Sequence, residues 1–122
     1  MNSNINTGKN YEKTAADYLK KSGYKIIEMN YRMLPVGEID IIAKDKKTFV
    51  FVEVKFRKNQ DFGCPSEFVN KSKQLKITKT ALYYIKTNKL KNDIRFDVIS
   101  ICGGITEHIK NAFCINSGVY YL

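Results

Sequence analysis

Two acidic residues and a lysine have a spacing that could support chemistry on a phosphate ester. Asp40 closes the segment Gly37–Asp40, and Glu53 and Lys55 interrupt an otherwise apolar run of Val and Phe residues. Side chains alternate across a strand, so Glu53 and Lys55 point to the same face of a sheet. A carboxylate and an ammonium in the middle of such a strand need a reason, and binding of a divalent cation provides one.

The spacing of the two acids fits a β-hairpin. If residues 46–47 form its turn, Asp40 lies opposite Glu53, with Cβ atoms roughly 5 Å apart on one face. Opposed carboxylates repel each other, but Mg²⁺ binds to a few carboxylate oxygens together with water and phosphate. The hairpin therefore predicts a metal site, provided that no one-residue bulge shifts the register.

Lys55 would complete a hydrolytic site beside this metal. A bound metal lowers the pKa of water, and a nearby ammonium orients that water or stabilises the charge that develops on the phosphate. The alternative is a local Glu53–Lys55 salt bridge on a solvated strand face, which is favoured for an isolated Glu-x-Lys tripeptide. The upstream Asp40, the apolar strand and the basic composition shift the interpretation toward chemistry.

Length and charge restrict the class of protein. The chain has 122 residues, 43% of them hydrophobic, and we expect a single domain over 1–122 with loosely ordered ends at 1–6 and 116–122. Its 21 Lys and Arg residues exceed its 12 Asp and Glu residues, which gives a formal charge of +9. This charge favours nucleic acid as the partner, although it could also serve solubility or a membrane surface. No apolar run could span a membrane and no secretory signal is present, so we expect no membrane partner and a cytoplasmic protein.

The cysteines predict no metal centre. Cys64, Cys102 and Cys114 are widely spaced, no Cys-x-x-Cys pair occurs, and His108 is the only histidine. A zinc site of cysteine and histidine therefore has little support. We expect three reduced thiols, with at least Cys102 in the core, and a surface position for His108.

Hydrophobic periodicity predicts two helices and five strands. The helical pattern covers 7–22 and a second stretch that begins near 66 or 71 and ends at 87, and the strands cover 24–31, 38–44, 48–57, 94–102 and 106–115. Three strands joined by short turns should pair antiparallel, whereas the crossover through the second helix lets the fourth strand run parallel to the third. The order αβββαββ predicts an α/β fold with a mixed β-sheet flanked by helices.

The sequence resembles a known group of nucleases. Asp40 followed by Glu53-x-Lys55 on a hairpin is similar to the PD-(D/E)xK nuclease superfamily, and the segments GEIDIIA and FVEVKFR resemble more closely the YraN-type endonuclease family. Further similar segments, which together extend from Gly8 to Phe113, are GKNYEKTAADYLKKSGYKII, NYRMLPVGEIDIIAKD, KSKQLKITKTALYYI, RFDVISI and HIKNAF. The resemblance implies a restriction-endonuclease-like fold, with a layout similar to that of archaeal Holliday-junction resolvases.

The resemblance also implies roles for particular residues. Asp40 and Glu53 would hold Mg²⁺ or Mn²⁺ together with the backbone carbonyl of Val54, and Lys55 would assist the attacking water. Glu12 would position a second metal or a water, although without the resemblance it is more simply a solvated acid in the first turns of a helix. The implied activity is metal-dependent endonucleolytic hydrolysis of DNA, and a preference for junction or branched DNA and a homodimer would be consistent with it.

Gln74 and Asp97 receive no catalytic role. Some nucleases of the superfamily carry Gln-x-x-x-Tyr on the helix after the active strand, but here Gln74 is followed four residues later by Thr78. This difference argues against the exonuclease branch. We expect Asp97 to form an ion pair with Arg95 or Arg57 rather than to enter the site.

Basic residues at and beyond the end of the strand that carries Glu53 and Lys55 could contact successive phosphates of a nucleic-acid backbone. The candidates for nucleic-acid binding are Arg57, Lys58, Lys71, Lys73 and Gln74. A lysine-rich helix face is, however, more often simply solvated. Two other functions therefore stay open, namely a nucleic-acid-binding module of the same fold with little or no catalysis, and a structural partner in a larger complex.

Overall fold

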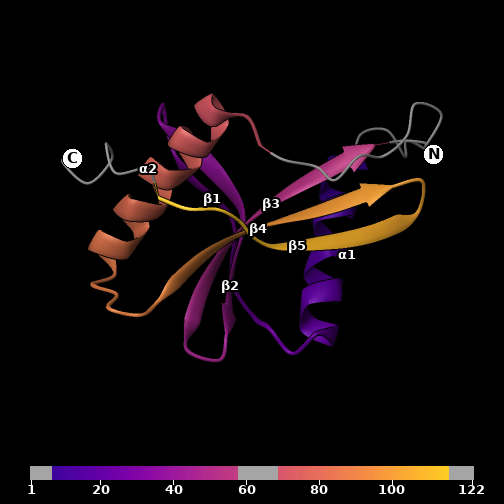
Figure 1. The fold of residues 1–122 in the computed structure, drawn as a ribbon, viewed down its shortest axis with the longest axis horizontal. Helices are drawn as coiled ribbons and strands as arrows, with labels where there is room; N and C mark the ends of the chain where they lie inside the picture. Colours follow the sequence, from indigo (N-terminus) through magenta and orange to yellow (C-terminus); the bar gives the residue numbers. More distant parts are fainter. Residues whose placement is uncertain (1–6, 58–68, 116–122) are drawn as a thin grey trace.

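A computed structural model describes residues 7–57 and 69–115 of the chain (Figure 1). The order of helices and strands is the one that the sequence predicts. The expected loose ends, 1–6 and 116–122, lie outside the described residues. The bounds are α1 Thr7–Lys21, β1 Lys25–Met33, β2 Gly37–Asp45, β3 Thr48–Arg57, α2 Lys71–Thr87, β4 Ile94–Cys102 and β5 Ile105–Phe113.

The five strands form one mixed sheet in the order β1-β2-β3-β4-β5. The pairs β1–β2, β2–β3 and β4–β5 are antiparallel, and the pair β3–β4 is parallel. The segment that contains α2 is the long connection that a parallel pair requires. The predicted α/β architecture is confirmed, and it is consistent with a restriction-endonuclease-like fold.

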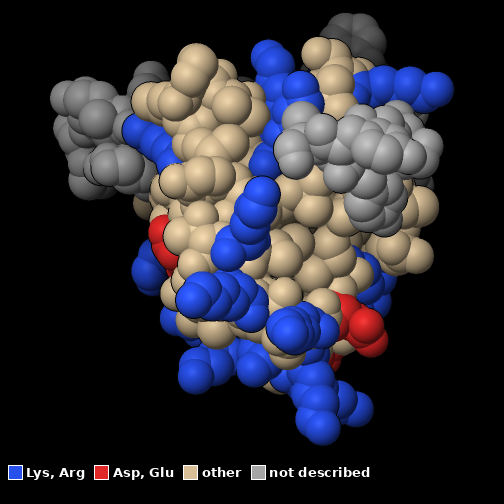
Figure 2. Space-filling model, turned by 90° about the vertical axis from the view of Figure 1, so that its left-hand side faces the viewer, with Lys and Arg blue, Asp and Glu red and all other residues tan. Residues whose placement is uncertain are grey.

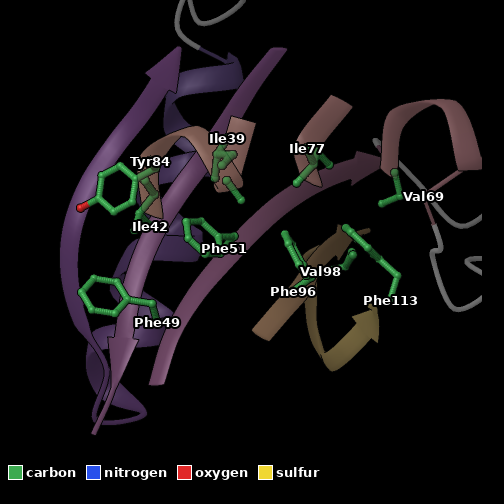
Figure 3. Close-up of a cluster of buried hydrophobic side chains, with 11 residues drawn as sticks. Ile39, Ile42, Phe49, Phe51, Val69, Ile77, Tyr84, Phe96, Val98 and Phe113 are labelled. Carbon is green, nitrogen blue, oxygen red and sulfur yellow. The ribbon is translucent and has the colours of Figure 1, made fainter. Parts of the chain in front are cut away.

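The helices cover opposite faces of the sheet, and each face carries a buried apolar cluster. The cluster between the sheet and α2 includes Phe49, Phe51 and Ile77 (Figure 3). The cluster under α1 includes Val50 and Val52. Alternation along β3 thus sends Phe49 and Phe51 toward α2 and Val50 and Val52 toward α1, which explains why this strand is a continuous apolar run in the sequence.

Local sequence determines where the two helices end and begin. Gly23, with a φ of 93°, turns the chain in the left-handed region just after α1. The side chain of Asn70 accepts a hydrogen bond of 2.8 Å from the backbone N–H of Lys73, so Asn70 caps α2 at the later of the two predicted starts. Within the described ranges, neither α1 nor α2 is long and apolar enough to cross a membrane.

The alternation of β2 is interrupted at Asp40. Ile39 and Ile42 both belong to the cluster under α2, whereas Ile41 belongs to the cluster under α1. Strict alternation would place Ile39 and Ile41 on the same face. At the same level of β1, Asn30 has a left-handed φ of 54°. Asp40 therefore lies at a local irregularity that two neighbouring strands share.

Gly37 allows α2 to lie close to β2. A Cβ atom on Gly37 would lie 2.9 Å from Oγ1 of Thr80 and 3.2 Å from the backbone oxygen of Lys76. The Thr80 hydroxyl donates a 2.8 Å hydrogen bond to that same backbone oxygen, so its position is fixed. The helix can approach this closely because residue 37 has no side chain.

A buried ionic network joins β4 to β5. The carboxylate of Asp97 is fully buried and accepts hydrogen bonds from Nε of Arg95 at 2.8 Å and from the backbone N–H of Asn111 at 2.9 Å. Nε2 of His108 lies 2.7 Å from the same carboxylate. The predicted Asp97–Arg95 pair is confirmed. The predicted surface position of His108 is wrong, because its contact with Asp97 leaves the side chain only 4% exposed.

One expectation about the cysteines is confirmed and another is wrong. Cys102 is buried, as predicted, but it forms a disulfide. The expectation of three reduced thiols therefore fails, because spacing along the chain does not show which sulfur atoms the fold brings within bonding distance. Cys114 is free and exposed, and Cys64 lies outside the described residues.

Candidate active site

The ladder between β2 and β3 follows the predicted register and ends just before the two acids. Asp45 pairs with Thr48, and the last pair is Ile41 with Val52. Thus no bulge shifts the register between the turn and Ile41. The next two residues on the two strands are Asp40 and Glu53, and both line the same pocket.

The side chain of Asp40 replaces the backbone ladder at this point. Its Oδ2 atom accepts a hydrogen bond of 2.8 Å from the backbone N–H of Val54. The N–H and C=O of one strand residue face the same neighbouring strand, so the Val54 carbonyl also faces β2. This orientation is compatible with the metal-ligand role predicted for that carbonyl, which stays a prediction.

Glu53 is buried and has a lysine partner on α2. Its side chain is 4% exposed, and Nζ of Lys73 lies 2.7 Å from its Oε2 atom. Among the described residues, no other N–H or hydroxyl group donates a hydrogen bond to this oxygen. The sequence pointed to Lys73 as a phosphate contact and missed its pairing with Glu53. The crossover topology contained the signal, because a helix that packs back over β3 must bring its first turns near the polar side chains on that face.

The two carboxyl groups strongly influence each other. Burial raises the pKa of Asp40 to about 8, and a hydrogen bond to Glu53 and the charges of Glu53 and Glu12 act in the same direction. The Val54 N–H lowers it, but by less than the other contributions raise it. Hydrogen bonding to Glu53 raises the pKa of Lys73, as do the charges of Glu53 and Asp40, whereas partial burial lowers it. At neutral pH the site must therefore hold an extra proton or an additional cation.

The donor set fits a hard dication. Carboxylate and carbonyl oxygens are the ligands that Mg²⁺ accepts, and this ion usually retains several waters. Glu12 influences Asp40 through its charge, but in the described ranges no three or more Asp, Glu, His or Cys side chains gather closely enough to hold a metal. Asp40 and Glu53 would therefore bind such an ion together with water and phosphate oxygens.

Lys55 lies on the same face of β3 as Glu53. Its neighbours Val54 and Phe56 pack against the cluster under α1, so alternation turns Lys55 toward the other side. The Lys55 side chain is half-buried, and its residue pairs with Ser100 of β4. The predicted placement of Glu53 and Lys55 on one face thus agrees with the structure.

The predicted nucleic-acid contacts lie in different environments. Arg57 ends β3 and is exposed, and Lys71 is exposed in the first turn of α2. Lys58 lies outside the described residues. Nε2 of Gln74 donates a hydrogen bond of 2.6 Å to the backbone oxygen of Val69, so this side chain stabilises the start of α2.

The acidic pair lines a pocket of about 370 Å³ between β2, β3 and the first half of α2. Lys73 and Lys76 lie on its helical wall, and Gly37 lies on its strand wall. Because a water molecule occupies about 30 Å³ of liquid, the pocket has room for a phosphate group and several waters. It thus combines three acids, Glu38 as well as Asp40 and Glu53, with nearby ammonium groups and solvent access.

This fold and site define a class, namely a basic α/β domain with a mixed five-stranded sheet, consistent with a restriction-endonuclease-like fold, and an acidic pair where the β2–β3 ladder ends. The chain belongs to the uncharacterised protein family UPF0102, whose model matches residues 11–101. This finding confirms the family part of the resemblance to YraN-type proteins.

Relatives from different organisms match most of the chain. A UPF0102 protein of Thermodesulfovibrio yellowstonii is 53% identical over 109 residues, which cover 89% of this chain and 96% of the relative. A UPF0102 protein of Clostridioides difficile is 51% identical over 105 residues, covering 84% of this chain and 91% of the relative. A UPF0102 protein of Syntrophus aciditrophicus is 46% identical over 118 residues, covering 93% and 92%.

Proposed function

We propose that this protein is a metal-dependent endonuclease that hydrolyses phosphodiester bonds in DNA. The observation that carries the proposal is the pair of a partly buried Asp40 and a buried Glu53, which lines an open pocket and has Lys55 on the same face of β3. Two carboxyl groups in contact destabilise a fold unless something neutralises them. A dication does so and also attracts the phosphate of a nucleic acid.

Each side chain of the site has a role in this proposal. Asp40, Glu53 and the Val54 carbonyl would hold Mg²⁺ or Mn²⁺, which supplies a more acidic water and positive charge for the phosphate. Lys55 would orient the attacking water or stabilise the charge that develops on the phosphate oxygens. Glu12 would add negative charge from the α1 side and position a second metal or a water.

Lys73 would keep the site ready for the metal. Its ammonium compensates the buried charge of Glu53 and lies at the pocket wall with a side chain that is 49% exposed. With a dication bound at Asp40 and Glu53, the Lys73 ammonium would be free to contact a phosphate. Lys73 would therefore compensate the charge of Glu53 before a metal binds and would make the predicted phosphate contact afterwards.

A cleavage screen tests the proposal. Duplex, single-stranded, flap and four-way junction DNA, with RNA counterparts, are incubated with the protein in Mg²⁺, Mn²⁺ or EDTA. We expect divalent-dependent cutting of DNA that Asp40→Asn and Lys55→Ala abolish while binding persists. Glu107→Gln, which removes an exposed acid on β5, should cut like the wild type. If folded wild-type protein cuts none of these substrates with either metal, the proposal is wrong.

A preference for junction or branched DNA and a homodimer extend the same proposal. Cutting two strands of a junction requires two sites, which a symmetric dimer supplies. Faster cleavage of the four-way junction than of the matched duplex, together with a dimer mass by light scattering, would support this extension. Equal rates on both substrates from a monomer would contradict it.

One observation favours a binding module without catalysis as a second candidate. Lys73 already compensates Glu53, and among the described residues no third acid lies close enough to the pair to complete a metal-binding group. Titration with Mn²⁺ separates the two functions. A nuclease should bind Mn²⁺ and lose this binding in Asp40→Asn, whereas a pure binding module should retain DNA affinity without measurable Mn²⁺ binding.

A further inference from the structure

A second and larger hollow lies along the other half of α2, away from the acidic pair. It has a volume of about 770 Å³ and mostly apolar walls. Met33 and Val36, around the β1–β2 connection, form one wall, and Leu82 and Ile85 of α2 form another. Tyr83 lines the same hollow with half of its surface exposed. We call this hollow the α2 groove.

The α2 groove is surrounded by lysines. Lys79, Lys86, Lys89 and Lys91 line it, and no acidic residue of the described chain does. None of these four lysines forms an ion pair with a described carboxylate. Figure 2 shows the side of the molecule on which α2 lies, with lysine and arginine side chains over much of its surface and few acidic ones. An occupant of the groove should therefore combine apolar surface with several negative charges.

We propose that the α2 groove binds an unpaired strand of nucleic acid. Bases offer flat apolar faces that stack on aromatic side chains such as Tyr83, and the phosphates of the same strand attract lysines. Lys79 and Lys86 are seven residues apart on α2, or about 10 Å along its axis. Positive charge is thus spread along the groove, which matches a chain of phosphates better than the single charged end of a fatty acid.

The groove and the acidic pocket share one helix. Lys76 lines the pocket, and Lys86, ten residues further along α2, lines the groove. Ten residues span about 15 Å, which is about four nucleotides of a stacked strand. This step rests on the proposed function: an unpaired strand in the groove would place a phosphate a few nucleotides away at Asp40 and Glu53. DNA with an unpaired arm is then the favoured substrate.

Binding of a fluorescein-labelled thymidine oligonucleotide in EDTA tests the groove without any need for cleavage. Tyr83→Ala should weaken binding about 5- to 150-fold, because stacking on one aromatic ring contributes about 1–3 kcal/mol per base. Tyr83→Phe, which keeps the ring, should bind like the wild type. Lys86→Gln with Lys91→Gln should weaken binding and reduce its salt dependence more than the matched α1 pair Lys20→Gln with Lys21→Gln.

The outcomes also separate this proposal from the proposed function. If all these variants keep native circular dichroism and bind the oligonucleotide like the wild type, the groove proposal is wrong, even where duplex cleavage is intact. If the groove variants lose binding but no substrate is ever cut, the groove proposal holds and the nuclease proposal fails. Dimerisation that Tyr83→Ala abolishes, without any effect on oligonucleotide binding, would instead assign the groove to a second copy of the chain.

Discussion

The Asp40 carboxylate accepts a 2.8 Å hydrogen bond from the Val54 backbone N–H at the point where the β2–β3 ladder ends. Glu53 lies between Val52, the last β3 residue that pairs with β2, and Val54, and its carboxyl group interacts with Asp40. The Asp40 side chain thus forms a stabilising hydrogen bond with the backbone and is also repelled by the charge of Glu53. These two effects can be separated by substitution.

Replacing Asp40 should divide its structural role from its charge. Asp40→Asn keeps an oxygen for the Val54 N–H and removes the repulsion, so its free energy of unfolding without metal should equal or exceed that of the wild type at pH 8. Asp40→Ala loses the acceptor and should be about 1–3 kcal/mol less stable than Asp40→Asn. Urea unfolding measures both values. Equal stability of the two variants would show that the hydrogen bond contributes little.

The pKa of Asp40 predicts how stability changes with pH. Because burial raises this pKa to about 8, the folded protein holds a proton that the unfolded chain has already released above pH 4. The contribution of Asp40 to stability is therefore largest below its unfolded pKa and is lost as pH rises toward 8. Relative to Asp40→Asn, the wild type should lose stability over this window. A parallel pH profile of the two proteins would contradict the assignment.

Lys73→Gln should make the protein more dependent on a divalent cation. The substitution leaves the buried Glu53 charge without its ammonium partner. The melting temperature in EDTA should fall, and Mn²⁺ should raise it by more than it raises that of the wild type. The control is Lys71→Gln, which changes an exposed lysine two residues before Lys73. This variant should respond to Mn²⁺ like the wild type. An identical Mn²⁺ response in all three proteins would rule out a metal beside Glu53.

Asp97→Ala should be the most destabilising of these changes, and it should act without touching the acidic pocket. Burial raises the pKa of Asp97, but hydrogen bonds from His108, Arg95 and the Asn111 N–H outweigh it and hold the pKa below its usual value. The group therefore stabilises the fold above its unfolded pKa, and this contribution is lost as pH falls through the folded pKa. Removing one partner of a buried ion pair costs about 3–5 kcal/mol. Chemical unfolding at pH 7 measures the loss, and a change below 1 kcal/mol would contradict a structural role.

Strand and helix patterns were sufficient to predict the fold. The alternation in β3 and the hairpin spacing from Asp45 to Val52 depend on neighbours in sequence, so they were predictable and the structure agrees with them. The approach of Lys73 to Glu53 depends on how α2 packs over the sheet, and no local pattern encodes that distance.

The other differences also come from long-range packing. His108 is buried because β5 places it against Asp97 of β4, a contact that a lone histidine in a polar segment does not indicate. The change of face at Asp40 involves a shared irregularity of β1 and β2, whereas the sequence of β2 alone suggests simple alternation.

The missing side chain of Gly37 has a consequence for the chemistry of the pocket. Even a methyl group there would press on Thr80 and on the backbone of Lys76, whose positions a hydrogen bond holds. The α2 helix would have to move away from β2, and Lys73, one turn before Lys76, would move away from Glu53 with it. The absence of a side chain at Gly37 thus keeps α2 close enough to the sheet for Lys73, or a metal ion in its place, to contact Glu53.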